Sequence, residues 1–322
     1  MVGDDNRPMT LPSDEALCGT VVLDDWGLLR VSGPDAATFL NGQLTQQMLG
    51  LQAGQARLAG YCSAKGRLLA TFVAWPVAPD HVLLACSADI AALTAKRLAM
   101  YVLRAKCRVQ DVSADFTIIG HAASAATDAA SDPPSMQEPW PVQVDRDGWA
   151  VTLPTVQRVH RQLLVQPRAR PASAEAPLDP QAWRWLEASS GVPRIVAATV
   201  EQFVPQMVNL ELVGGVDFRK GCFPGQEVVA RSQYRGTLKR RMFLFDSARP
   251  AQPGQDIVHS EDPAQPAGMV VNAGTLAGRG SRVLAEVKLA ALESGTLHVG
   301  SFDGEPLRRV DLPYSLADAV TS

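Results

Sequence analysis

One cysteine stands in a dense group of turn-forming and charged residues. Cys222 directly follows Arg219, Lys220 and Gly221, and it precedes Gln226 and Glu227. The same stretch holds Gly214, Gly215, Gly221 and Gly225. Glycines allow a sharp turn and a close approach of the backbone. Neighbouring cations favour the thiolate, which is a nucleophile, a soft metal ligand and a redox group. The residues alone leave two interpretations open: a reactive thiol, or a hairpin whose cysteine is a small buried hydrophobic residue.

A tryptophan occupies a turn near the start of the chain. Trp26 follows Asp24 and Asp25 and lies between two apolar stretches that predict strands, 20–23 and 27–31. An indole in a turn needs a cover, and its flat face suits a flat heteroaromatic ligand. Packing against a neighbouring domain is the alternative, and the residues by themselves favour it.

The remaining chemistry-bearing residues form no recognised site. The five cysteines contain no C-x-x-C pair, and the five histidines lack the spacing of metal ligands. No G-x-S-x-G segment is present, and Gly278-Arg279-Gly280 lacks the third glycine of a dinucleotide-binding loop. We therefore expect no built-in metal site. Unpaired, widely spaced cysteines indicate a reducing compartment.

Composition limits the class of protein. The chain has 322 residues, a net charge of −3 and a pI near 6.0, which argues against a dedicated nucleic-acid binder. Residues 1–16 do not resemble a signal peptide, and no apolar run is long enough to span a membrane. We expect a cytoplasmic protein that does not contact the membrane.

One segment of the chain is more basic than the chain as a whole. Residues 219–241 contain a single acid, Glu227, and seven cations: Arg219, Lys220, Arg231, Arg235, Lys239, Arg240 and Arg241. This basic stripe would suit an anionic ligand tail or a phosphate backbone, although most such runs are solvated faces.

The pattern along the chain predicts an α+β fold. Helices are expected after Pro34, over 87–103 with Ile90, Leu93, Met100 and Tyr101 on one side, and from Asp179-Pro180 to Gly191. Residues 122–139 are rich in Ala, Ser, Asp and Pro, and we interpret them as a mobile surface segment. Short alternating strands after Lys239 predict a small C-terminal β-barrel. We therefore expect one region of two α+β lobes over 12–240 and the barrel over 241–322.

Several motifs resemble those of one family. Lys220-Gly221-Cys222-Phe223-x-Gly225-Gln226-Glu227 is similar to the signature of the YgfZ/GcvT-like folate-binding proteins, relatives of the glycine-cleavage aminomethyltransferase. Further segments match in family order over roughly 20–316: 31–45, Lys65-Gly66-Arg67, Tyr101-Val102-Leu103-Arg104, 203–210 and Leu312-Pro313-Tyr314.

The resemblance implies a fold, a cofactor and a role. The fold would be three lobes around a central opening that binds tetrahydrofolate or a one-carbon derivative. Trp26 and Trp183 would contact the folate, with Trp185 as the competitor if the helix phase is misread. Family members support iron–sulfur cluster maintenance, and through cluster enzymes tRNA thiomodification. Cys222, tuned by Lys220 and Arg219, would be the redox or cluster-related thiol facing the same opening.

Two other classes of function stay open. One is a folate-dependent transferase of aminomethyl or one-carbon groups, so that turnover itself is undecided. The other is a non-catalytic tRNA-binding or scaffold protein that uses the basic stripe.

Asp217, Asn209 and Glu211 flank the cysteine motif and could pair with the polar edge of a pterin.

Overall fold

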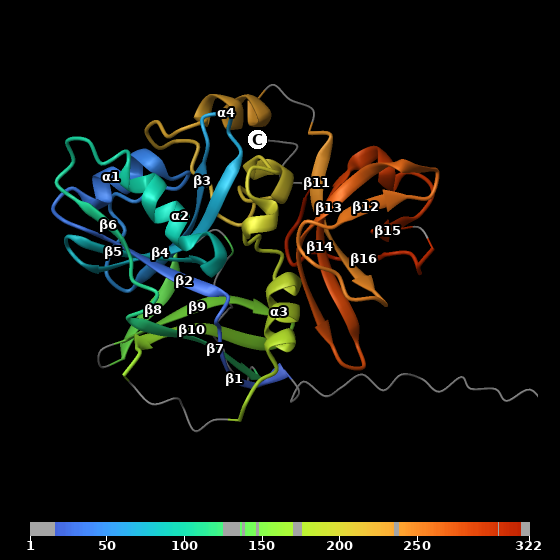
Figure 1. Cartoon of the computed structure of the whole chain (residues 1–322), viewed down its shortest axis with the longest axis horizontal. Coiled ribbons are helices and arrows are strands. Elements are labelled where there is room, and N and C mark those ends of the chain that lie inside the picture. Colours follow the sequence, from blue (N-terminus) through green and yellow to red (C-terminus); the bar gives the residue numbers. More distant parts are fainter. Residues whose placement is uncertain are drawn as a thin grey trace, which may run out of the picture.

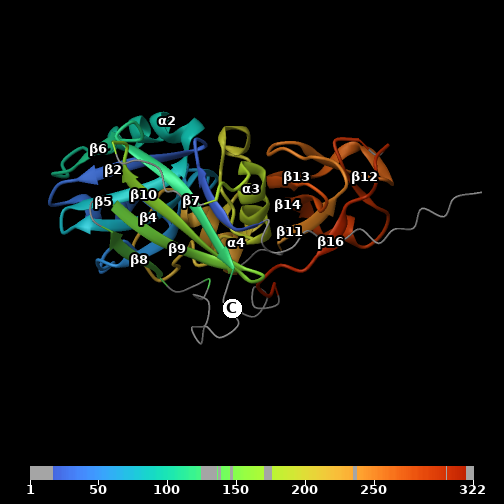
Figure 2. The same ribbon diagram turned by 90° about the horizontal axis from the view of Figure 1, so that it is seen from below.

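The computed structural model describes residues 17–124, 136, 139–145, 148–169, 176–234, 238–301 and 303–316. A large strand-rich body and a smaller sheet lie side by side, with helix α3 (Pro180–Ser189) between them (Figure 1). The view from below shows the same order (Figure 2). The helix therefore lies where side chains from both bodies can converge.

The large body contains a sheet of ten strands in the order β1-β7-β10-β9-β8-β3-β4-β5-β2-β6, and all its strand pairs are antiparallel. The strands are β1 (Gly19–Val22), β2 (Trp26–Ser32), β3 (Gln55–Cys62), β4 (Leu68–Ala78), β5 (His81–Ser87), β6 (Arg108–Asp111), β7 (Phe116–Ser124), β8 (Trp140–Asp145), β9 (Gly148–Val156) and β10 (Val159–Pro167). The two strands expected around Trp26 are present as β1 and β2.

The second body is a six-stranded antiparallel sheet in the order β15-β12-β13-β14-β11-β16. Its strands are β11 (Arg240–Ser247), β12 (Asp256–His259), β13 (Asp262–Leu276), β14 (Gly280–Lys288), β15 (Leu297–Val299) and β16 (Arg308–Val310). The sheet begins at Arg240, and the division of the chain into 12–240 and 241–322 stays a prediction.

Besides α3, the described residues form helices α1 (Ala36–Gln43), α2 (Ala88–Ala99) and α4 (Gln226–Tyr234), and short 3-10 turns at Ala197–Thr199, Pro205–Val208 and Leu289–Leu292. Helix α3 begins as the sequence predicts. The Asp179 side chain accepts a hydrogen bond from the Gln181 backbone N–H at 2.7 Å, Pro180 takes the first turn, and Gly191 has φ +68°.

Helix α2 buries Ile90 as expected, but the rest of its buried side differs from the one predicted. Leu93 and Met100 are 72% and 62% exposed, whereas Ala91, Ala95 and Leu98 are buried against β2, β5 and β6. Small side chains let the helix approach the strands closely. The positions of the large apolar side chains therefore did not predict the buried face of the helix. The helix also ends at Ala99, four residues earlier than expected.

The segment 122–139 is only partly described. Residues 122–124 belong to β7, and 125–135 and 137–138 lie outside the described residues, as do 12–16 and 317–322 of the two expected regions.

Candidate functional site

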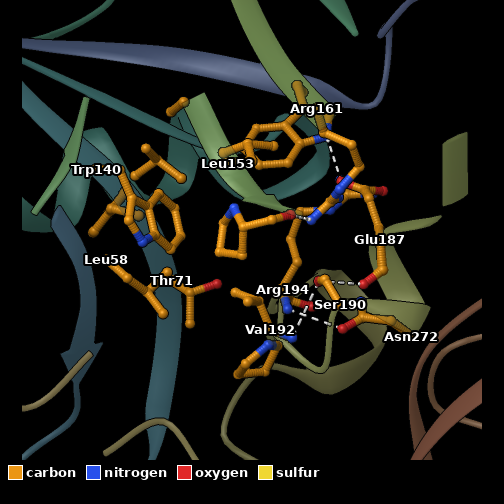
Figure 3. A pocket seen from close by; sticks show the side chains of 16 residues that line it. Leu58, Thr71, Trp140, Leu153, Arg161, Glu187, Ser190, Val192, Arg194 and Asn272 are labelled. Atoms are coloured by element: carbon orange, nitrogen blue, oxygen red, sulfur yellow. Dashed lines mark hydrogen bonds and ion pairs between the residues drawn. The ribbon is translucent and has the colours of Figure 1, made fainter. Parts of the chain in front are cut away.

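A narrow cavity with a volume of ≈ 50 Å³ lies between the large sheet and the end of α3. Figure 3 shows its walls. Strands β3, β8 and β9 contribute Leu58, Trp140 and Leu153, and the segment after α3 contributes Val192 and Pro193. Apolar faces opposite one another suit a flat ring better than a highly hydrated ligand.

The polar side of this cavity is an ion-pair cluster around Trp26. The Trp26 Nε1 donates a hydrogen bond to Glu187 Oε1 at 3.1 Å. Arg194 Nη2 lies 3.2 Å from Glu187 Oε2 and 3.0 Å from Asp25 Oδ2, and its guanidinium lies 4.9 Å from the Trp26 ring centre. Arg184 Nε completes the cluster, 3.1 Å from Asp25 Oδ2. The hydrogen bond from Trp26 to Glu187 thus joins chain segments 161 residues apart at one indole.

Burial and charge set the ionisation of these groups in opposite ways. Burial would raise the pKa of Asp25, but Arg194 and Arg184 hold it below its usual value. Burial raises the pKa of Glu187 above its usual value, although Arg194 opposes the effect. Burial alone would lower the pKa of Arg194, whereas Glu187 and Asp25 bring it above its usual range. Glu187 is therefore the more easily protonated of the two carboxylates.

A second arginine lines the cavity, and it makes no ion pair with any residue that the structure describes. In β10, Val159, Leu163 and Val165 point inward, and Arg161 shares their side and is only 2% exposed. Its Nη2 donates to the Pro154 carbonyl at 3.0 Å, and its Nε has no acceptor among the described residues. Burial lowers the pKa of Arg161 to about 10, with Glu187 opposing the shift.

Trp183 and Trp185, the two candidates on α3, do not line the cavity. Trp183 is fully buried and packs on Gly120 of β7, where any Cβ would lie 2.7 Å from the indole ring, with the Arg161 guanidinium 5.8 Å from the ring centre. Trp185 points to the second sheet, where the Arg282 guanidinium carbon lies 4.6 Å from the centre of its ring. The expected contact of Trp183 with a folate therefore finds no support in the walls of this cavity and stays a prediction. The helix presents Glu187 to the cavity, one turn further along.

The cysteine motif lies on the surface near α1. Cys222 and Arg219 are exposed, and Arg219 Nε lies 4.0 Å from Asp217 Oδ1. Lys220 turns inward instead, where its Nζ donates to the carbonyls of Asn41 and Leu44 at the end of α1, at 2.5 and 2.9 Å. Burial lowers the pKa of Lys220 to about 8, with Asp217 and the thiol opposing the shift. A cation at a helix C-terminus stabilises the helix, so Lys220 fixes this loop to α1.

The second half of the motif is fixed by a close backbone contact. Gly225 has φ +77°, and a Cβ there would lie 2.4 Å from the Ser63 carbonyl oxygen. Gln226 then begins α4 and Glu227 is exposed. Gly221 has open space around it and no left-handed φ. The two motifs around Lys65 and Cys222 therefore meet at Gly225.

The cavity and the cysteine are separated by a second, more open pocket. This adjoining pocket shares Leu58 and Trp140 with the cavity, and it is lined by Asp217, Phe218 and Arg219. Cys222 belongs to the described walls of neither. The inward turn of Lys220 leaves the next two residues at the surface, and the expectation that the sulfur faces the same opening as Trp26 stays a prediction.

The residues proposed for the polar edge of a pterin serve other contacts. Asn209 Nδ2 donates to the Met242 carbonyl at 2.8 Å and lies 3.2 Å from the Tyr314 hydroxyl. Glu211 pairs with Arg241, both nearly buried. Asp217 accepts from the Arg219 backbone N–H at 2.8 Å. The two contacts of Asn209 join segment 203–210 to Met242 of β11 and to Tyr314 of the C-terminal Leu312-Pro313-Tyr314.

The basic stripe does not form one continuous surface. Lys220 is held by carbonyls, Arg240 Nη1 donates to both carboxylate oxygens of buried Glu286, and Arg241 is buried with Glu211. Arg235 lies outside the described residues, and the exposed cations are Arg219, Arg231 and Lys239.

The described ranges hold neither a metal-ligand cluster nor a membrane-spanning helix. No group of three His, Cys, Asp or Glu side chains gathers there in a way that could hold a metal ion. In the same ranges, none of the helices combines the length and apolar character needed to cross a bilayer.

Sequence patterns did not indicate Glu187, Arg194 or Arg161 as residues of the site. A signal existed for Arg161, since a charged residue interrupts the inward apolar positions of an alternating strand. Glu187 follows Trp183 by one helical turn, and Arg194 lies just beyond Gly191. Their partner Asp25 is far away in sequence, so periodicity could not reveal the cluster.

Comparison with known proteins gives two close parallels. The chain is 31% identical over 316 residues to the tRNA-modifying protein YgfZ of Edwardsiella ictaluri (strain 93-146), covering 91% of each chain. The structure matches the glycine cleavage system aminomethyltransferase T from Bartonella henselae with a TM-score of 0.70 and 16% identity, over 93% of this chain and 86% of that one. This likeness confirms the GcvT-like α+β fold. No protein-family model matches the chain.

Proposed function

The chain belongs to the YgfZ family, and from this premise we propose that the cavity at Trp26 binds a folate, as tetrahydrofolate or a one-carbon derivative. The observation that carries the proposal is the pairing of apolar walls with the Trp26–Glu187–Arg194 cluster. A pteridine ring is flat and apolar on its faces, and it carries hydrogen-bonding groups along its edge.

The residues present fit such a ring. Leu58, Trp140 and Leu153 offer apolar contact to its faces. Each Glu187 oxygen accepts one hydrogen bond in the structure and can accept another. When bound, tetrahydrofolate would supply one-carbon or redox chemistry, and this chain would hold the ring and exclude water from it.

We further propose that the protein supports tRNA modification through iron–sulfur enzymes. The name of the E. ictaluri relative supports a role in tRNA modification. Among the described residues no two cysteines form a disulfide, which supports a reducing compartment such as the cytoplasm.

In this proposal Cys222 is the residue that meets the iron–sulfur partner. It is the exposed cysteine of the five, so a partner could reach its sulfur without unfolding the chain. After loss of the Sγ proton to solvent, the thiolate could ligate iron of a cluster held by that partner. A redox role would need a second thiol and a two-electron acceptor from the partner.

Fluorescence titration tests the folate proposal. Two of the six tryptophans, Trp26 and Trp140, line the cavity, so a bound folate should quench emission saturably. Trp26→Phe should remove part of the quenching and weaken binding. Trp149→Phe is the matched control, because Trp149 lies against Phe116 and outside the cavity. Unsaturable quenching in the wild type would count against the proposal.

Complementation tests the role of Cys222. In a strain that lacks this protein, Cys222→Ala should fail to restore a cluster-dependent tRNA modification, while the purified variant still binds folate. Cys107→Ala, a half-buried thiol, is the control and should restore it. Equal rescue by both variants would remove Cys222 from the proposal. The fold shared with an aminomethyltransferase at 16% identity supports no transfer activity by itself.

A further inference from the structure

The cavity at Trp26 contains more hydrogen-bond donors than acceptors. Among its described lining residues, two buried N–H groups have no acceptor, the Nε of Arg161 and the Nε of Arg194, and no buried side-chain oxygen lacks a partner. Asn272 exchanges two hydrogen bonds with the Arg194 backbone, both at 2.9 Å. Thr71 Oγ1 accepts from the Ile195 N–H at 3.0 Å. A ligand that completes the cavity must therefore bring acceptor atoms.

Arg161 is the more available of the two guanidinium groups. Arg194 is held by Asp25 and Glu187 on three hydrogen bonds. Arg161 makes one described hydrogen bond, to the Pro154 carbonyl. Glu187 is the opposite charge that acts on Arg161, but no ion-pair contact joins the two in the described residues. A buried charge without such a contact is costly to the fold, and an apolar residue would satisfy the inward pattern of β10. This arrangement is understandable if Arg161 is kept for a ligand.

Resting on the proposed folate site, we propose that Arg161 binds the 4-oxo group of the pteridine ring and makes the cavity specific for 4-oxo over 4-amino pteridines. In a 4-oxo pteridine, the N3–H donor and the oxygen at C4 are neighbours on one edge. Glu187 offers an acceptor beside the donors of Arg161, so the two side chains match that edge. A 4-amino group would direct its N–H donors at the guanidinium of Arg161. The amine and the guanidinium would then both lack an acceptor.

The direct test compares two ligands that differ only at position 4. Folic acid and its 4-amino-4-deoxy analogue, aminopterin, are titrated by calorimetry, and both are used as tetrahydro forms if the wild type binds only reduced folate. We expect the wild type to bind the 4-oxo compound about tenfold to a hundredfold more tightly. Arg161→Met should reduce this ratio to within about threefold, and Arg161→Gln, which keeps an N–H donor, should restore part of it.

Thermal unfolding separates this role from a structural one. If Arg161 is kept for the ligand, Arg161→Met should leave the melting temperature of the free protein unchanged or higher, because a buried charge is replaced by an apolar side chain. Arg282→Met is the matched control. Arg282 is also buried over a tryptophan, but it pairs with Asp246 outside the cavity. That variant should melt lower and keep the wild-type ligand ratio.

The outcomes are distinguishable. If neither pteridine binds the wild type in any oxidation state, the proposed folate site itself fails. If both bind equally, or if Arg161→Met keeps the full preference, the folate site stands and the role of Arg161 is rejected. A lower melting temperature with an unchanged ratio in Arg161→Met would show that the residue is structural only.

Discussion

Trp26 and Glu187 are joined by a 3.1 Å hydrogen bond between the indole Nε1 and the carboxylate Oε1, across 161 residues of sequence. This contact ties the first residue of β2 to α3 and fixes the indole at the cavity wall. Arg194 pairs with the same carboxylate and lies over the same ring. The site therefore depends on one buried set of charges, and several consequences can be measured.

Removal of Arg194 should destabilise the protein strongly. Arg194→Met leaves Glu187 buried without its closest cation and takes one of two from Asp25. Breaking a buried pair in this way costs about 3–5 kcal/mol of the free energy of unfolding. Urea unfolding measures the change. Arg308→Met, which removes an 80% exposed side chain from its pair with Asp246, should cost about 0–1 kcal/mol. Similar losses in both variants would contradict the importance of the cluster.

Cys222 should react faster with thiol reagents than the other cysteines. It is exposed, whereas Cys62 and Cys86 are buried, and burial raises the pKa of each of those two thiols to about 12. Native protein treated briefly with a maleimide should carry one label per chain, on Cys222 by peptide mass spectrometry. Unfolded protein should carry five. Labelling spread over several cysteines in the native state would show that the loop does not present the sulfur as described.

Stability should depend on pH through Lys220. Its native pKa of about 8 lies below the ordinary value of 10.5, so between these values the unfolded chain binds more protons than the native one. The contribution of Lys220 to stability must therefore rise as the pH increases from 8 toward 10.5. Urea unfolding of the wild type and Lys220→Met at pH 7, 8, 9 and 10 measures this. The difference between the two free energies of unfolding should move in favour of the wild type above pH 8. A constant difference would refute the shift.

Two glycines of the cysteine motif should respond differently to alanine. Gly225→Ala places a Cβ 2.4 Å from the Ser63 carbonyl oxygen at a left-handed φ, and should lower the free energy of unfolding by about 1–3 kcal/mol. Gly221→Ala meets no atom within 4 Å and should change it by less than about 1 kcal/mol. Thermal or urea unfolding of the two variants provides the comparison, and equal losses would contradict the described packing of Gly225 on the Ser63–Gly66 turn.

Local signals predicted local structure well. Asp179, Pro180 and Gly191 define where α3 begins and ends, because capping and left-handed backbone depend on residues within one turn. The phase of α2 was misjudged for a related reason. Leu93 and Met100 are large and apolar, yet the close approach of α2 to its strands selects Ala91 and Ala95 for the buried side.

The site was less predictable because its contacts are long-range. The resemblance directed attention to Trp26, which lines the cavity, and to Trp183, which lies behind Arg161. The role of Glu187 can be recognised only from its contacts with Trp26 and Arg194. These contacts arise from the packing of α3 against the start of β2. No property of the segment around Glu187 alone could indicate it.

The most direct test of the central claim is a calorimetric titration of the wild type and Glu187→Gln with tetrahydrofolate. Glutamine keeps a carbonyl oxygen for the Trp26 Nε1 but removes the charge, so the indole should stay in place while the ligand loses a charged acceptor. The account predicts one saturable site per chain in the wild type and binding weaker by about tenfold or more in the variant. No binding to the wild type, or equal affinity in both proteins, would contradict it.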